Sequence, residues 1–139
     1  MVSFLFYFII VILISCSTEK HVIKLDEYDT KKEYYTNGTL MYESNYKYNK
    51  LDGISRSWDE NGILISKVEY KDGLINGAWE TYYLSGQLKN KAVYMNGKKN
   101  GIETWFHSNG KKQSEAHYIN DILSSEIIRW NENGQQISN

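Results

Sequence analysis

The sequence contains no proline and a single cysteine, and its charges almost cancel. The 139-residue chain has 16 Lys and Arg against 17 Asp and Glu, a formal net charge of −1. A protein that holds nucleic acid by its phosphates carries a basic excess, so this balance argues against nucleic-acid binding. One cysteine excludes an internal disulfide framework and a cysteine-rich metal site. Apolar residues at 41% and charged residues at 24% fit a chain that folds.

Residues with catalytic or metal-binding chemistry are also few. The only histidines are His21, His107 and His117, and no carboxylate or cysteine completes a ligand set at metal spacing. The acidic runs 59–62 and 131–134 resemble calcium loops only faintly, because they lack the spaced ligands and the closing Glu. No phosphate-binding glycine motif is present. We therefore expect no metal, no cofactor, no catalytic residue and no small-molecule substrate, and hence not an enzyme.

The N-terminus carries an uncharged apolar run from Val2 to Ser15. A membrane-spanning helix needs roughly 20 apolar residues, so this run has the length of a signal-peptide core. It ends in Leu13-Ile14-Ser15-Cys16, which resembles the lipobox of bacterial lipoproteins. That resemblance implies cleavage before Cys16 and a diacylglycerol on its thiol, with further acyl chains such as palmitate. The alternative is an ordinary signal peptide or short anchor followed by a chance cysteine.

The residue after Cys16 is Ser17 and not Asp. In this respect the chain resembles enterobacterial lipoproteins that are delivered to the outer membrane. We therefore expect a lipid-anchored protein of the bacterial cell envelope, held at the outer membrane. Residues 1–15 are predicted to be a lipoprotein signal peptide that forms a helix, and residues 16–31 a lipidated cysteine with a tether.

The remainder of the chain repeats every 24 residues. Glycines recur at this interval in one column of five: Gly38, Gly62, Gly86, Gly110 and Gly134. A tyrosine column keeps the same period: Tyr46, Tyr70, Tyr94 and Tyr118. The shorter columns Gly53, Gly77, Gly101 and Gly73, Gly97 account for every other glycine. A fixed period of this length indicates a repeat architecture in which each unit packs on its neighbours.

Each repeat is predicted to be two β-strands. Residues 87–94 alternate between two unlike faces, as a strand does. Pairing Trp58 with Leu64 requires a loop of odd length, which we take as the three residues Glu60-Asn61-Gly62, with Gly62 at the position that must be left-handed. Asp72-Gly73 and Asn96-Gly97 are typical of two-residue type I′ turns. We expect the Asn-Gly pairs at 76–77 and 100–101 to be bulges that restore the alternation of faces.

These residues resemble the variant MORN repeat, as found in the YwqK-like family of antitoxin-labelled repeat proteins. The third repeat carries the pattern most fully, from Gly77-Ala78-Trp79 through Gly86 and Leu88 to Tyr94 and Asn96-Gly97. The resemblance implies an all-β fold: a single-layer antiparallel β-meander of stacked hairpins that binds or scaffolds. We expect a repeat domain over 32–139, divided at about 32–53, 54–77, 78–101, 102–125 and 126–139.

The aromatic residues are the candidate binding surface. A single-layer sheet leaves part of its apolar surface exposed, and such stripes mark binding sites. Each aromatic column can equally be the hydrophobic contact that holds neighbouring repeats together. Trp79 and Trp105 have the opposite numbering parity from the tyrosine column, so with Tyr83 and Tyr35 they are the preferred binding candidates.

Two functions are compatible with these features. The first is a non-enzymatic, membrane-anchored lipoprotein whose repeat sheet binds a protein or a surface polymer. The alternative, implied only by the family label, is an antitoxin or immunity protein that binds a cognate toxin.

Overall fold

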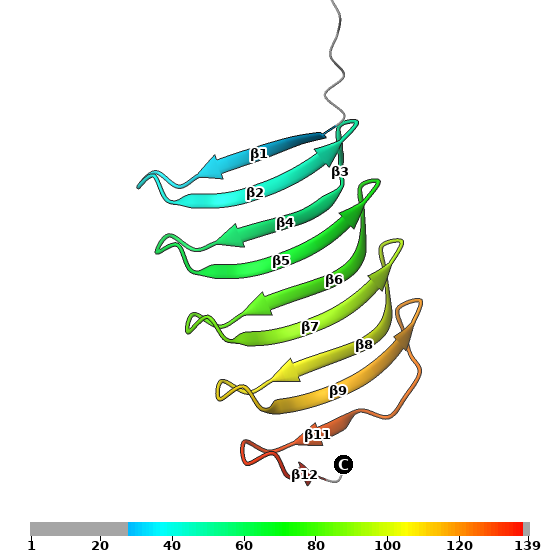
Figure 1. Cartoon of the computed structure of the whole chain (residues 1–139). Helices are drawn as coiled ribbons and strands as arrows, with labels where there is room; N and C mark the ends of the chain where they lie inside the picture. The colour runs from blue at the N-terminus through cyan, green and yellow to red at the C-terminus, as the bar shows by residue number, and fades with distance from the viewer. Residues whose placement is uncertain (1–27, 138–139) are drawn as a thin grey trace, which may run out of the picture.

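The computed structural model describes residues 28–137, which form one antiparallel β-sheet (Figure 1). The strands are β1 (Tyr28–Tyr34), β2 (Leu40–Lys47), β3 (Lys50–Leu51), β4 (Gly53–Trp58), β5 (Leu64–Lys71), β6 (Leu74–Tyr82), β7 (Leu88–Met95), β8 (Lys98–Phe106), β9 (Lys112–Ile119), β10 (Ile122–Leu123), β11 (Ile128–Trp130) and β12 (Gln136–Ile137). The predicted signal helix, Cys16 and His21 lie outside the described residues. Within residues 28–137, no helix is long and apolar enough to cross a membrane.

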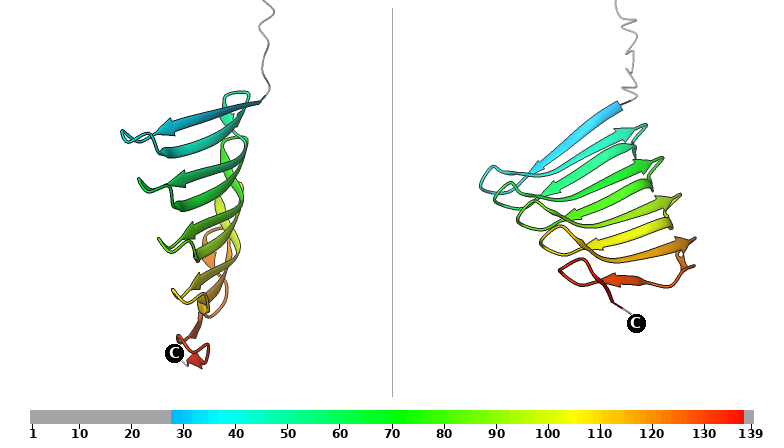
Figure 2. Two further views of the ribbon diagram at one scale, coloured as in Figure 1. Left: turned by 60° about the vertical axis from the view of Figure 1, so that its left-hand side comes forward. Right: turned by 60° about the horizontal axis from the view of Figure 1, so that its bottom comes forward.

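The strands follow one another through the sheet in chain order. Each main strand pairs with the next, from β1 to β12, while the two-residue strands β3 and β10 pair only with β2 and β9. The two further views show one twisted layer with the C-terminus at the end opposite β1 (Figure 2). The predicted all-β meander of stacked hairpins is therefore confirmed. The first strand begins at Tyr28, so the sheet reaches four residues further toward the N-terminus than the expected start at residue 32.

The three-residue turns lie together at one end of the strands and have the predicted geometry. At the second of them, the Asp59 amide donates to the Ile63 carbonyl at 2.9 Å, and the Gly62 amide donates to the Asp59 carbonyl at 3.0 Å. Gly62 has φ +80°, and the other four glycines of its column have φ between +82° and +86°. Glycine occupies this left-handed region without the steric cost of a Cβ, which explains its recurrence.

The two-residue turns lie at the opposite end of the strands and also match the prediction. Asp72 and Gly73 both have positive φ, at 51° and 87°, as a type I′ turn requires. The same conformation persists at turns without glycine, where positive φ values occur at Tyr48, Asn49, Asn120 and Asp121. The pairing of the two flanking strands therefore imposes the turn conformation even where glycine is absent.

The predicted role of the bulges was wrong. Tyr70 pairs with Ile75 and Val68 with Trp79, so three residues of β6 lie opposite the single residue Glu69. Two extra residues leave the alternation of faces unchanged. The one-residue shift that changes it lies beside the first four three-residue turns, as between Ser57 and Trp58. Trp79 therefore shares a face with Val68 and the tyrosine column despite its odd number.

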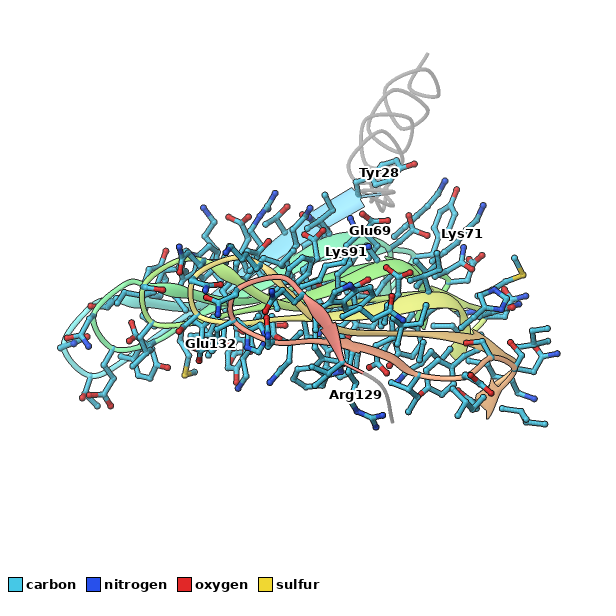
Figure 3. The ribbon with its side chains drawn as sticks, turned by 90° about the horizontal axis from the view of Figure 1, so that it is seen from below. Tyr28, Glu69, Lys71, Lys91, Arg129 and Glu132 are labelled. Atoms are coloured by element: carbon cyan, nitrogen blue, oxygen red, sulfur yellow. The ribbon has the colours of Figure 1, made fainter. Side chains whose placement is uncertain are left out.

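The sheet has two unlike faces. The tyrosine face carries the column Tyr46, Tyr70, Tyr94 and Tyr118 together with the small side chains between its strands. The charged face carries a row of ionic side chains, Lys32, Glu43, Arg56, Lys67, Glu80 and Lys91. Seen from below, Glu69 and Lys91 project to one side of the sheet and Arg129 to the other (Figure 3).

The core is a thin stripe on the tyrosine face. The most buried described residues are Ala92, Ala116 and Asn90, with exposed fractions of 2%, 7% and 8%. All three are small or medium-sized and lie on the interior strands β7 and β9. The Asn90 side-chain amide donates to the Thr104 carbonyl at 3.2 Å, which satisfies its buried polar group. With so little buried apolar volume, stability depends on contacts between neighbouring strands.

Candidate functional site

The tyrosine face presents uncovered aromatic rings along the described sheet. Lysine side chains lie over two of its column rings, with Lys31 Nζ 4.6 Å from the Tyr46 centroid and Lys99 Nζ 4.4 Å from that of Tyr118. Tyr42, on the same face, is 46% exposed. Aromatic rings that no second layer covers are available to a partner.

An open hollow lies on this face over β2, β4 and β5. Its volume is about 250 Å³. It is lined by three tyrosines, four serines and two aliphatic residues. These are Tyr42, Tyr46, Tyr70, Ser44, Ser55, Ser57, Ser66, Leu51 and Val68. Arg56 is also among the lining residues, but its side chain lies on the charged face, where its guanidinium Nη1 is 3.1 Å from Glu43 Oε1. The hollow forms because serines occupy positions that hold bulkier side chains in the next repeat.

Ser55 is the least satisfied polar residue of the hollow. Its hydroxyl oxygen is buried, and within the described part of the chain it has no hydrogen-bond partner. Buried hydroxyls normally have a partner, because an unmade hydrogen bond in this setting costs about 1–3 kcal/mol. Because this oxygen is closed to solvent, a group that enters the hollow could supply the missing hydrogen bond once the Ser55 side chain rotates toward it.

The structure places the two predicted tryptophans on the tyrosine face. Trp79 tilts against Tyr94 with ring centroids 5.8 Å apart, and its Nε1 donates to Ser66 Oγ at 3.1 Å. Trp105 pairs with Asn90 on the same face and is 38% exposed. Trp79 is therefore largely committed to contacts within the sheet, whereas Trp105 presents more of its ring to solvent.

Tyr35 and Tyr83 lie at the three-residue turns, apart from the hollow. Their hydroxyls donate to the carbonyls of Trp58 at 2.9 Å and Phe106 at 2.7 Å, each in the following repeat. His107 occupies the same place in the fourth repeat, and its Nε2 lies 2.8 Å from the Trp130 carbonyl. These side chains join consecutive repeats, a role that the sequence analysis missed. The 24-residue column that contains all three was the available signal.

Where this column holds a short side chain, the turn is stabilised locally. Asp59 Oδ1 accepts hydrogen bonds from the amides of Ile63 at 2.8 Å and Asn61 at 3.0 Å. The hydrogen bond from Ile63 is the main cause that lowers the pKa of Asp59 from its ordinary value. Asn131 accepts the same pair of bonds from Gln135 and Asn133. The two runs that resembled calcium loops are thus explained by their turns.

The carboxylates of the charged face are held in ion pairs. Glu43 pairs with Lys32 at 3.3 Å and with Arg56 at 3.1 Å, and Glu80 pairs with Lys67 at 3.2 Å and Lys91 at 3.0 Å. Burial acts to raise the pKa of Glu80, but hydrogen bonds from Lys91, Lys67 and the Tyr82 hydroxyl outweigh burial and lower it. Each of the two carboxylates therefore has two cationic partners within the row.

A larger hollow, of about 520 Å³, lies beside Ala116, His117 and Ile128 near the C-terminal end. It arises because β11 pairs with β9 over only two residues, Ile128 with Glu115 and Arg129 with Ser114. His117 Nδ1 lies 2.8 Å from Ser124 Oγ in the same region. Over residues 28–137, no three His, Cys, Asp or Glu side chains gather where they could hold a metal ion.

Comparison with known proteins identifies the repeated unit. A family model described as MORN repeat variant matches four segments, residues 30–48, 51–72, 75–96 and 99–120. Each of the last three begins at a strand, includes a three-residue turn and ends in a two-residue turn. A search of the curated proteins found no match to this chain.

Proposed function

Because the chain belongs to the family of MORN repeat variants, we propose that it is a non-enzymatic lipoprotein of the bacterial cell envelope whose tyrosine face binds a protein or a surface polymer. The observation that carries this proposal is the uncovered tyrosine face with its hollow over Ser55. A face of exposed rings around small side chains is typical of a binding surface.

The tyrosine face is a better candidate than the charged face. The ionic row on the charged face pairs within itself at 3.0–3.3 Å, so a partner would have to displace existing contacts. On the tyrosine face, Tyr42 and Trp105 are exposed by 46% and 38% and present apolar surface to water. Burying that surface against a partner would contribute about 25 cal/mol per Å².

Binding to the tyrosine face is tested by cross-linking in intact membranes. Tyr42→Ser removes an exposed ring from the tyrosine face, and Tyr28→Ser, the matched control, removes a ring that is 62% exposed on the other side of the sheet. We expect the Tyr42 variant to lose the cross-linked partner and the Tyr28 variant to retain it. Equal capture by both variants would contradict the assignment of the face. A captured toxin whose effect is relieved by co-expression of this chain would instead favour an immunity role.

The anchor is supported by the sequence Leu13-Ile14-Ser15-Cys16. Cys16→Ser removes the thiol that would be acylated, so we expect loss of fatty-acid incorporation and release from the membrane fraction. Ser15→Ala keeps a small residue before the cysteine and serves as the control. Membrane association of the wild type without acyl incorporation would refute the lipid anchor.

A further inference from the structure

The repeats allow one part of the tyrosine face to be compared with another. Residues 24 positions apart occupy equivalent places, so Ser55 corresponds to Trp79. The tyrosine beside each of them is likewise equivalent, Tyr70 for Ser55 and Tyr94 for Trp79. The hollow over Ser55 therefore has a filled counterpart one repeat further along the sheet.

In the filled counterpart, an indole occupies the space between the strands. The Trp79 ring contacts Tyr94 at a centroid distance of 5.8 Å and donates from Nε1 to Ser66 at 3.1 Å. At Ser55 the same strand position carries only a hydroxymethyl group, and a hollow of about 250 Å³ remains. This volume is below the roughly 300–1,000 Å³ of pockets for drug-sized ligands, and suits one large side chain.

The lining of the hollow defines the chemistry of its occupant. Tyr42, Tyr46 and Tyr70 offer ring surfaces, and the serine hydroxyls offer hydrogen bonds. Among the described lining residues Arg56 alone is charged, and its guanidinium is engaged by Glu43. A charged occupant would thus lose its hydration without gaining a counter-charge. A neutral ring with one polar edge fits the walls and can pair with Ser55 Oγ.

We propose that the hollow over Ser55 accepts a tryptophan or tyrosine side chain of a partner protein, which takes the place that Trp79 takes within the sheet one repeat later. This inference rests on the proposed function, because it names the partner chemistry of the same face. It favours a protein over a surface polymer as the partner. The incoming ring packs on Tyr70, and rotation of the Ser55 side chain brings its buried hydroxyl to the N–H or O–H of that ring.

The inference is tested with small probes on the full chain in mild detergent. N-acetyl-tryptophanamide and N-acetyl-tyrosinamide are titrated while the backbone amide signals of Ser55 and Val68 are followed by nuclear magnetic resonance. N-acetyl-leucinamide and a chitin disaccharide are the comparison probes. We expect saturable shifts at these amides with the two aromatic probes, at least tenfold weaker with the leucine probe, and none with the sugar.

Two substitutions fill the hollow from within. Ser55→Trp supplies the indole internally, and Ser55→Leu supplies a smaller apolar group if the larger one prevents folding. Both should weaken binding of the aromatic probes at least tenfold, and Ser55→Trp should raise the midpoint of urea unfolding. Ile102→Trp is the matched control, because it adds an indole to the charged face, where Ile102 is 50% exposed.

The outcomes separate this inference from the proposed function. Absence of saturable shifts, equal binding of the leucine probe, binding of the sugar alone, or unchanged binding by the filled variants would each overturn the aromatic site. Partner capture that depends on Tyr42 would still support the proposed function in those cases. Probe binding at Ser55 without any captured partner would uphold the site and count against the proposed function.

Discussion

Gly101 lies at the bend where β8 leaves its two-residue turn, and its replacement by alanine tests how the repeats are held. Gly101 has φ +134°, a region that L-residues rarely occupy. A Cβ at this position would lie 3.1 Å from Val93 Cβ on the neighbouring strand. Gly86, at a three-residue turn, has φ +83°, and a Cβ there would meet nothing within 4 Å, so it isolates the effect of backbone conformation.

The magnitudes follow from this difference. A left-handed conformation costs an L-residue about 1–2 kcal/mol, and the loss of glycine's freedom in the unfolded chain returns about 0.4–1 kcal/mol. Gly86→Ala should therefore lower the free energy of unfolding by about 1 kcal/mol. Gly101→Ala adds crowding against Val93, for which overpacked sites lose about 1–3 kcal/mol, so its total should be about 3 kcal/mol.

The assay is urea unfolding of the purified chain in mild detergent, followed by circular dichroism and tryptophan fluorescence. Val93→Gly should reduce the cost of Gly101→Ala by about 1 kcal/mol, because the atom nearest to the new Cβ, Val93 Cβ at 3.1 Å, is then gone. The Val93→Gly single variant is the reference for the double variant, because glycine within a strand has a cost of its own. A Gly101 variant no less stable than the Gly86 variant, or no recovery in the double variant, would refute this reasoning.

Three further predictions concern single side chains. Glu80→Gln should lower the free energy of unfolding by about 1 kcal/mol at pH 7. Because the folded pKa of Glu80 is lowered, its stabilisation is present above the unfolded value of about 4.3 and is lost as pH falls through the folded pKa, so wild type and variant should converge in acid-dependent melting curves. Tyr83→Phe removes the 2.7 Å hydrogen bond to the Phe106 carbonyl and should cost about 1 kcal/mol in urea, whereas an unchanged midpoint would contradict its role between repeats. Asn49→Gly relieves a positive φ of 61°, so it should raise the free energy of unfolding by less than about 1 kcal/mol and raise the melting temperature. A lower melting temperature would contradict the strain argument.

The fold could be predicted because its turns require particular residues. Glycine at Gly62 and its equivalents marks a left-handed position, and Asp72-Gly73 marks a type I′ turn. The period of these signals determined the number and order of the hairpins. The N-terminal limit was less predictable, because Tyr28 and its neighbours carry no turn signal and lie in an exposed edge strand.

The faces and the site were harder to predict. The register shift between Ser57 and Trp58 is a backbone feature that no residue type indicates. The face on which Trp79 lies could therefore not be predicted from whether its residue number is odd or even. The hydrogen bond from Tyr83 joins residues 23 positions apart and depends on how closely the repeats stack. The hollow arises from a small side chain, Ser55, and comparison of equivalent columns could have located it.

The serial pairing of the strands gives the molecule an adjustable reach. Each 24-residue unit adds two strands, and neighbouring strands are about 4.8 Å apart, so one unit extends the sheet by roughly 10 Å. The N-terminal strand β1 and the C-terminal strand β12 stand at opposite ends of the array. Gain or loss of a whole unit during evolution would thus move the distal end by a fixed step while leaving every remaining hairpin with its own neighbours. A tandem duplication in the gene would then lengthen the span and leave the surface of the existing hairpins in place.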